Sequence, residues 1–296
     1  MMTTKFIGTG VALVTPFSEN NSVDFQGLQK LLTHITNGNV GYLVVHGTTG
    51  EAATTTPKEK IDILSFIHAH NPKSLPIVCG IGGNSTREVV SIIENTDFQG
   101  IDAILSASPY YNRPSQEGIY QHYIALAEAC PIPMLLYNVP ARTGTNITAE
   151  TTLRLSKHPN IVGIKEASGN LLQCMEIAKG THHDDFLIIS GEDILTLPMI
   201  AAGAVGVISA IANGFPKEMT HMVDLALQGD DATARLYTWS LLPLDKLIGR
   251  AGNPVGTKQM LAALGICENY VRLPLVAASA PLAQEIQAAV FQAGTK

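Results

Sequence analysis

The stretch Ile161-Val162-Gly163-Ile164-Lys165-Glu166 has the pattern of a buried parallel strand that ends in a lysine. Its first four residues are apolar or small, as expected for a strand that is covered on both faces. Burying an ammonium group at the end of such a strand costs free energy, so a lysine there suggests a function. Desolvation lowers a lysine pKa and leaves an amine that attacks carbonyls, so Schiff-base chemistry is one interpretation. A solvated lysine just beyond the strand end is the other.

Short runs of Val, Ile and Leu alternate eight times with longer amphipathic segments along the chain. The predicted strands are residues 7–15, 41–46, 76–80, 101–106, 133–138, 161–165, 186–190 and 205–209. Helix start signals lie between them at Pro57, at Ser85 with Glu88 as a capping box, and at Ser115. Eight parallel strands with intervening helices predict an α/β fold of the (β/α)8 TIM barrel type rather than an open doubly wound sheet.

The chain changes character after the eighth unit. Residues 230–296 are rich in Ala and Leu at helical spacing and predict about three appended helices. We therefore divide the sequence into a catalytic barrel, residues 1–229, and a C-terminal helical region, residues 230–296.

Composition narrows the classes of protein that fit. Of the 296 residues, 46% are hydrophobic and 15% charged, and the net charge of -6 has no basic run behind it. These features argue against a nucleic acid or a membrane surface as partner, and no apolar run reaches the roughly 18 to 20 residues of a membrane span. The four cysteines lack a C-x-x-C spacing and the histidines lack metal-ligand spacing, which predicts a cytoplasmic protein without a metal site.

Polar segments follow several predicted strands, at the ends from which barrel enzymes build their active sites. They are Gly47-Thr48-Thr49-Gly50-Glu51, Ser108 to Pro114 with Tyr110 and Tyr111, Tyr137 to Gly144 with Arg142, and Ser190-Gly191-Glu192-Asp193. Each segment alone could be ordinary turn chemistry. Because all of them belong to one rim of the predicted barrel, together they indicate a site around Lys165.

The residue types on this rim suit an amine nucleophile. Such a nucleophile needs proton shuttles, and Tyr137, Thr49 and Tyr111 are hydroxyl groups that relay protons without adding charge. Arg142 offers a planar guanidinium that suits the carboxylate of a second substrate. A keto acid and a carboxylated aldehyde are therefore the predicted substrates.

Motifs along almost the whole chain also carry a family resemblance. They run from Gly8-Thr9-Gly10-Val11-Ala12-Leu13-Val14-Thr15-Pro16-Phe17 through G-T-T-G-E, Y-N-V-P-A-R-T-G and G-I-K-E to Asn253-Pro254. The chain resembles the dihydrodipicolinate synthase (4-hydroxy-tetrahydrodipicolinate synthase) family, one of the pyruvate-dependent aldolases related to N-acetylneuraminate lyase. The resemblance implies condensation of pyruvate with L-aspartate 4-semialdehyde, the first committed step toward diaminopimelate and lysine. It also implies no cofactor besides a covalent pyruvate imine, and a homotetramer built as a dimer of dimers.

The resemblance assigns catalytic roles to four residues of this sequence. Lys165 matches the Schiff-base lysine and Tyr137 the general acid and base beside the imine. Thr49 matches a member of the proton relay. Tyr111 matches the relay tyrosine that the family supplies from the neighbouring subunit.

Four further positions match substrate-binding residues of the family. Thr48, with Thr49, matches the pair that holds the pyruvate carboxylate. Arg142 matches the arginine that receives the semialdehyde carboxylate, and Gly191 and Ile208 match positions that line the pyruvate pocket.

A second group of positions resembles the lysine feedback site of the family. Asn84, Glu88 and Tyr110 match this effector site, but Pro57 and Lys60 stand where lysine-inhibited members carry histidines. Lys60 would place a fixed positive charge near a cationic effector. We therefore expect weak or absent inhibition by lysine.

Two other functions fit the sequence less well. Arg142 argues against a pyruvate aldolase that cleaves a sialic acid or a keto-deoxy sugar acid. The proton-relay residues argue against a catalytically silent keto-acid sensor.

His46 stands before the Gly-Thr-Thr turn, where the family commonly has a smaller or apolar residue, and we interpret it as a packing residue.

Overall fold

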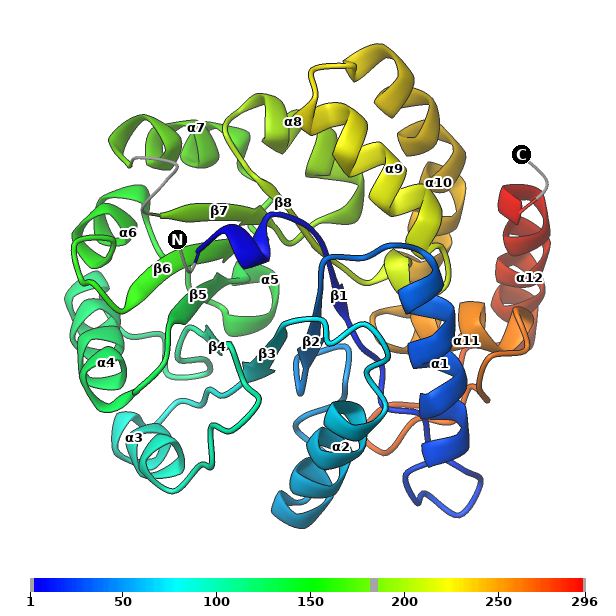
Figure 1. The fold of residues 1–296 in the computed structure, drawn as a ribbon, viewed down its shortest axis with the longest axis horizontal. Coiled ribbons are helices and arrows are strands. Elements are labelled where there is room, and N and C mark those ends of the chain that lie inside the picture. Colours follow the sequence, from blue (N-terminus) through cyan, green and yellow to red (C-terminus); the bar gives the residue numbers. More distant parts are fainter. Residues whose placement is uncertain (1–2, 182–185, 295–296) are drawn as a thin grey trace. The chain divides into compact units, whose positions relative to one another are not determined.

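The structure is a computed structural model that describes residues 3–181 and 186–294. Eight strands close into a barrel in the order of the sequence (Figure 1). They are β1 (Gly8–Ala12), β2 (Tyr42–Val45), β3 (Ile77–Gly80), β4 (Ala103–Ala107), β5 (Met134–Asn138), β6 (Ile161–Glu166), β7 (Leu187–Ser190) and β8 (Gly206–Ser209). Neighbouring strands from β3 to β8, and the pair β1 and β2, run parallel. The predicted (β/α)8 TIM barrel is confirmed.

The helices lie between and after the strands. They are α1 (Phe25–Asn37), α2 (Pro57–Ala69), α3 (Thr86–Glu94), α4 (Gln116–Ala129), α5 (Pro140–Thr143), α6 (Ala149–Leu155), α7 (Leu171–Gly180), α8 (Thr196–Ala201), α9 (Pro216–Leu227), α10 (Asp231–Ala251), α11 (Val255–Ala263) and α12 (Ala280–Gly294). Short 3-10 turns are η1 (Thr3–Phe6), η2 (Asp193–Leu195) and η3 (Ile211–Asn213). In Figure 1, α3, α4, α6 and α7 lie outside the strands β4 to β7.

Helix starts follow the sequence signals with one correction. Pro57 is the first residue of α2, and Thr56 with Glu59 forms a complete capping box before it. Ser115 caps α4 by accepting from the Gly118 amide. Ser85 does precede α3, but its side chain makes no capping hydrogen bond, so the capping box predicted there is wrong.

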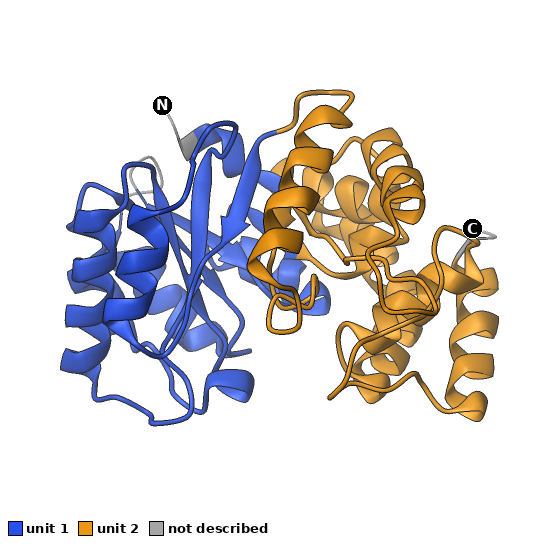
Figure 2. Cartoon of the chain, turned by 90° about the horizontal axis from the view of Figure 1, so that it is seen from below, with its two compact units in different colours: residues 1–8, 76–208 blue, residues 9–75, 209–296 orange. Residues whose placement is uncertain are grey.

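Three helices, α10 to α12, follow the last barrel unit, which confirms the predicted helical extension. Helix α10 buries Leu241, Leu244 and Ile248 on one face. By their internal contacts the residues group into two compact units, 1–8 with 76–208 and 9–75 with 209–296 (Figure 2). The proposed domain boundary at residue 229 stays a prediction.

The described residues contain no helix that is both long enough and apolar enough to cross a membrane.

Candidate active site

Lys165 and Tyr137 are paired residues on neighbouring strands of the unit that contains β3 to β8. The register of β5 and β6 sets Tyr137 beside Lys165. Lys165 is buried, with 7% of its surface exposed, and its Nζ lies 4.5 Å from the centroid of the Tyr137 ring. The interpretation of Lys165 as a solvated charge beyond the strand is therefore wrong. In residues 3–181 and 186–294, no carboxylate oxygen lies within ion-pair distance of this amine.

Gly191 packs directly against the Lys165 side chain. A Cβ at this position would lie 3.0 Å from Lys165 Cε and 2.6 Å from the Ala167 Cβ, so the close approach requires glycine. The Gly191 amide donates to the Glu166 carbonyl at 2.8 Å and holds the turn after β7 in place. Ile208, on β8 of the same unit, is also buried.

Glu166, the neighbour of Lys165, is a buried carboxylate surrounded by neutral donors. It accepts from Asn138 Nδ2 at 2.9 and 3.1 Å, from Gln173 Nε2 at 2.8 Å and from the Ser168 amide at 2.7 Å. No cation of the described chain forms an ion pair with it. Neutral hydrogen bonds therefore offset the desolvation of this charge.

Asn138 extends this network and connects the two strand ends. Its Oδ1 accepts from the Ile147 amide at 3.0 Å, and its Nδ2 also donates to Asn146 Oδ1 at 2.8 Å. Asn146 donates in turn to Gln173 Oε1 at 2.8 Å. Sequence analysis missed these residues, although Asn138 and Glu166 follow Tyr137 and Lys165 directly.

Thr48 and Thr49 lie in the turn after β2, in the other unit. Thr49 is buried, and its Oγ1 accepts a hydrogen bond from Asn253 Nδ2 at 2.9 Å, whereas Thr48 is half-buried. The carbonyl of Gly50 accepts from the Thr15 hydroxyl at 2.7 Å. The turn is thus held from two sides by side chains that are distant in the sequence.

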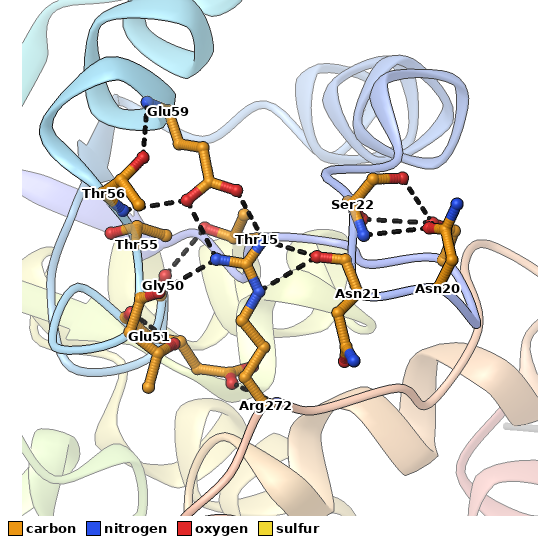
Figure 3. Close-up of polar contacts among 12 residues, drawn as sticks. Thr15, Asn20, Asn21, Ser22, Gly50, Glu51, Thr55, Thr56, Glu59 and Arg272 are labelled. Atoms are coloured by element: carbon orange, nitrogen blue, oxygen red, sulfur yellow. Dashed lines mark hydrogen bonds and ion pairs between the residues drawn. The ribbon is translucent and has the colours of Figure 1, made fainter.

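Glu51 ends this turn in a left-handed conformation, with φ +53°, and its side chain is buried. Its Oε1 lies 2.5 Å from Lys258 Nζ, and the two side chains are 1% and 0% exposed. Its Oε2 accepts from the Arg272 amide at 3.0 Å. Figure 3 shows the Arg272 guanidinium reaching from there to Glu59 and to the Asn21 carbonyl.

Almost the whole chain matches a known protein family. A model of the dihydrodipicolinate synthetase family matches residues 5–293. This chain belongs to that family. The resemblance that the motifs indicated is thereby confirmed.

Individual members of the family are similar over nearly their full length. The 4-hydroxy-tetrahydrodipicolinate synthase of Cytophaga hutchinsonii is 48% identical over 284 residues, which cover 96% of this chain and 95% of that protein. A monomeric dihydrodipicolinate synthase variant has a TM-score of 0.95 at 34% identity, covering 99% of this chain and 98% of its own. The chloride-inhibited dihydrodipicolinate synthase from Acinetobacter baumannii, in complex with pyruvate, has a TM-score of 0.93 at 35% identity, covering 97% and 99%.

Arg142 and Tyr111, two further positions matched to the family, are exposed. Arg142 lies in the single turn α5, and Tyr111 is 89% exposed with φ +76°. The pKa of Glu192 is raised above its ordinary value, because partial burial and the adjacent Asp193 outweigh the opposing effect of Lys165 and Arg142. By contrast, almost nothing of its own chain covers the Tyr111 ring.

His46 is a buried residue directly before the Gly-Thr-Thr turn, and its side chain contacts α2. Its Nε2 lies 3.0 Å from the Lys60 carbonyl, and its backbone has φ +58°. Burial lowers its pKa to about 4, so the ring is neutral near pH 7. His46 packs against the backbone of α2.

The residues that resemble the family's lysine effector site are accessible. Asn84 and Glu88 are exposed at the start of α3, and Tyr110 is 44% exposed. Pro57 and Lys60 belong to the first turn of α2. The predicted weakness of lysine inhibition stays a prediction.

Among residues 3–181 and 186–294, no three His, Cys, Asp or Glu side chains gather in a way that could hold a metal ion. All four cysteines are buried, and no disulfide joins any two of them.

Proposed function

We propose that this chain catalyses the Schiff-base condensation of pyruvate with L-aspartate 4-semialdehyde to 4-hydroxy-tetrahydrodipicolinate. The reaction belongs to the lyases and begins diaminopimelate and lysine biosynthesis. The observation that carries the proposal is the buried Lys165 amine in a member of the dihydrodipicolinate synthetase family. This amine lies over the Tyr137 ring, and no carboxylate of the described residues is within ion-pair distance of it.

Imine formation is the first chemical step. The Lys165 amine attacks the keto carbon of pyruvate, and the carbinolamine then loses water to give the imine. Tyr137 donates and accepts the protons of these steps. No cofactor is required, because the covalent imine itself acts as the electron sink.

Carbon–carbon bond formation follows from the imine. Loss of a proton from the pyruvate methyl group gives an enamine, whose carbon adds to the aldehyde of the semialdehyde. Thr49 and Tyr111 relay the protons together with Tyr137. The 89% exposure of Tyr111 fits a residue that completes the site of a neighbouring subunit.

Substrate binding uses the remaining matched positions. Thr48, with Thr49, holds the pyruvate carboxylate through hydroxyl and backbone N–H groups. Gly191 and Ile208 line the pocket for the rest of pyruvate. Arg142, which is exposed at the edge of the site, receives the carboxylate of the semialdehyde.

The proposed assembly is a cytoplasmic homotetramer built as a dimer of dimers, without nucleic acid or membrane partners. A monomeric variant occurs among the similar structures, so assembly must be measured. Sedimentation velocity at several protein concentrations distinguishes tetramer, dimer and monomer.

Borohydride reduction in the presence of pyruvate tests the chemistry. We expect a pyruvate adduct on the peptide that carries Lys165, together with turnover of the semialdehyde in a parallel assay. An adduct without turnover would move the protein to another aldolase specificity. No adduct at all would overturn the nucleophile and support a keto-acid sensor.

A further inference from the structure

Arg113 lies in the loop that joins β4 to α4, in the compact unit that also contains Lys165 and Tyr137. Its side chain is exposed, and its backbone is left-handed, with φ +49°. Tyr111, two residues earlier, is left-handed as well, with φ +76°. Such backbone is uncommon for residues other than glycine, and the strain that it stores concentrates at functional sites. The loop thus holds Arg113 in a conformation that its residue type does not favour.

The aliphatic part of Arg113 lies against the turn that carries Arg142. A Cβ at Gly144, two residues beyond Arg142, would lie 3.7 Å from both Cγ and Cδ of Arg113. Gly144 ends α5 in a left-handed conformation, with φ +71°, and its amide donates to the Pro140 carbonyl at 2.9 Å. The Arg113 side chain therefore reaches from the loop after β4 to the segment after β5 of the same chain.

Gln116 connects these two segments by hydrogen bonds. It is the first residue of α4, and its Nε2 donates to the Asn146 carbonyl at 2.7 Å. Its Oε1 accepts from the Thr148 amide at 3.1 Å. Because one backbone group is an acceptor and the other a donor, they fix the orientation of the Gln116 amide. The two bonds hold the segment of Arg113 and the segment of Arg142 side by side at the carboxyl ends of β4 and β5.

The Arg113 guanidinium is a positive charge that no carboxylate of residues 3–181 and 186–294 pairs with. Glu117, the acidic residue nearest to it in the sequence, instead pairs with Arg154 at 2.9 Å. An arginine side chain stays protonated in proteins. The charge of Arg113 is therefore available to an anion that approaches this part of the rim.

We propose that Arg113 is a specificity-determining residue for the second substrate, because its charge attracts the carboxylate of L-aspartate 4-semialdehyde to the place where Arg142 receives it. The inference rests on the proposed function, which assigns this carboxylate to Arg142. Pyruvate reacts at the buried Lys165, whereas Arg113 and Arg142 are exposed. The effect of Arg113 is therefore expected on the semialdehyde and not on pyruvate.

A series of charges at residue 113 tests the proposal. Arg113→Lys keeps the charge and should keep kcat/KM for the semialdehyde within about twofold, because attraction at long range depends on charge and not on guanidinium geometry. Arg113→Gln should lower kcat/KM about tenfold at low salt, the lower end of what electrostatic attraction contributes, and Arg113→Glu should lower it further. The change should appear in the KM for the semialdehyde with kcat nearly constant, because the charge acts on binding.

Salt provides a readout that a merely structural role would not move. At about 1 M salt the Debye length is about 3 Å, so the attraction between exposed charges is screened. The difference in kcat/KM between the wild type and Arg113→Gln should shrink several-fold there, and a difference that ignores salt would count against the proposal. Lys157→Gln is the matched control, because it removes an exposed positive charge from the segment before β6, at the end of the strand opposite to Lys165. It should leave the KM of both substrates unchanged.

Borohydride trapping of pyruvate separates this inference from the proposed function. Every variant at residue 113 should form the Lys165 adduct at the wild-type rate, and slower trapping in all three would overturn the inference by showing a general disturbance of the site. If the wild-type protein forms the adduct and consumes the semialdehyde, but kcat/KM does not follow the charge at residue 113, the inference alone is overturned. Failure of the wild-type protein to form the adduct would instead refute the proposed function itself.

Discussion

Both carboxylate oxygens of Glu166 accept hydrogen bonds from the side-chain amide of Asn138, at 2.9 and 3.1 Å. The same two residues are partners in the register of β5 and β6, one position beyond Tyr137 and Lys165. A buried carboxylate that takes two of its hydrogen bonds from the neighbouring strand penalises any slip between the strands. The distance between the proposed nucleophile and its proton donor is therefore maintained by residues that need not touch substrate.

Glu166→Gln should weaken both stability and imine formation. The new amide would place donor against donor at Asn138 or Gln173, and a buried donor without a partner costs about 1–3 kcal/mol. Urea unfolding measures the loss of stability, and the rate of borohydride trapping reports on the Lys165 geometry. The charge-swapped double variant Asn138→Asp with Glu166→Gln should recover part of both, and equal losses in the single and double variants would contradict the register argument.

Gly191→Ala should displace the Lys165 side chain. The added methyl would meet Lys165 Cε at 3.0 Å and the Ala167 Cβ at 2.6 Å, and overpacking of this kind costs about 1–3 kcal/mol. We expect pyruvate trapping to slow at least about tenfold, since about 1.4 kcal/mol corresponds to that factor. Gly249→Ala on α10 is the matched control, because its Cβ would have no neighbour within 4 Å, and it should leave trapping unchanged.

Lys258→Met should be strongly destabilising, because it leaves the buried Glu51 carboxylate without its cation. Breaking a buried pair from one side typically costs about 3–5 kcal/mol. The double variant Lys258→Met with Glu51→Gln removes both charges and should unfold at a higher urea concentration than the single variant. Lys58→Met provides a control at an exposed ion pair with Asp62, where the change should stay below about 1 kcal/mol.

The buried His122 makes stability depend on pH. Its Nδ1 lies 2.9 Å from the Thr86 hydroxyl, and burial lowers its pKa from 6.5 to about 4. The unfolded chain binds this proton at a higher pH than the folded chain does, so the stability is complete above pH 6.5 and is lost as the pH falls toward 4. The loss is at most about 3 kcal/mol. Urea midpoints measured across this range should vary less in His122→Gln than in the wild type, whereas His68→Gln, at an exposed position, should follow the wild-type curve.

Inhibition by L-lysine should be weak or absent at millimolar concentration. If the positions that resemble the family's effector site bind lysine here, Lys60 would add a positive charge near the effector cation, and at 4 to 6 Å that repulsion is on the order of 1 kcal/mol or more. Initial rates at increasing lysine concentration provide the measurement. Replacement of Pro57 and Lys60 by histidine should strengthen inhibition, and strong cooperative inhibition of the unaltered protein would contradict the prediction.

Local patterns were sufficient to predict the barrel. Each of the eight strands is a short apolar run that is followed by a helical segment. This alternation is visible in the sequence because both faces of a parallel sheet are buried, so its strands are almost entirely apolar. The position of Lys165 at the end of such a run already suggested a buried amine. The same local signals predicted the wrong hydrogen bonds at Ser85, since residue types permit a capping box without enforcing its side-chain geometry.

Long-range polar contacts could not be predicted from the sequence. Asn253 and Thr49 are 204 positions apart, and Glu51 and Lys258 are 207 apart by their numbers. The sequence of either segment does not identify the distant residues that it contacts, because hydrogen bonds and ion pairs depend on which segments the fold brings together. The alternation of strands and helices, the family and the residues suited to Schiff-base chemistry could all be predicted from the amino-acid sequence. The burial of Lys165 against Tyr137 and the donor that faces Thr49 could not, because both depend on strand register and on side chains packed from distant parts of the chain.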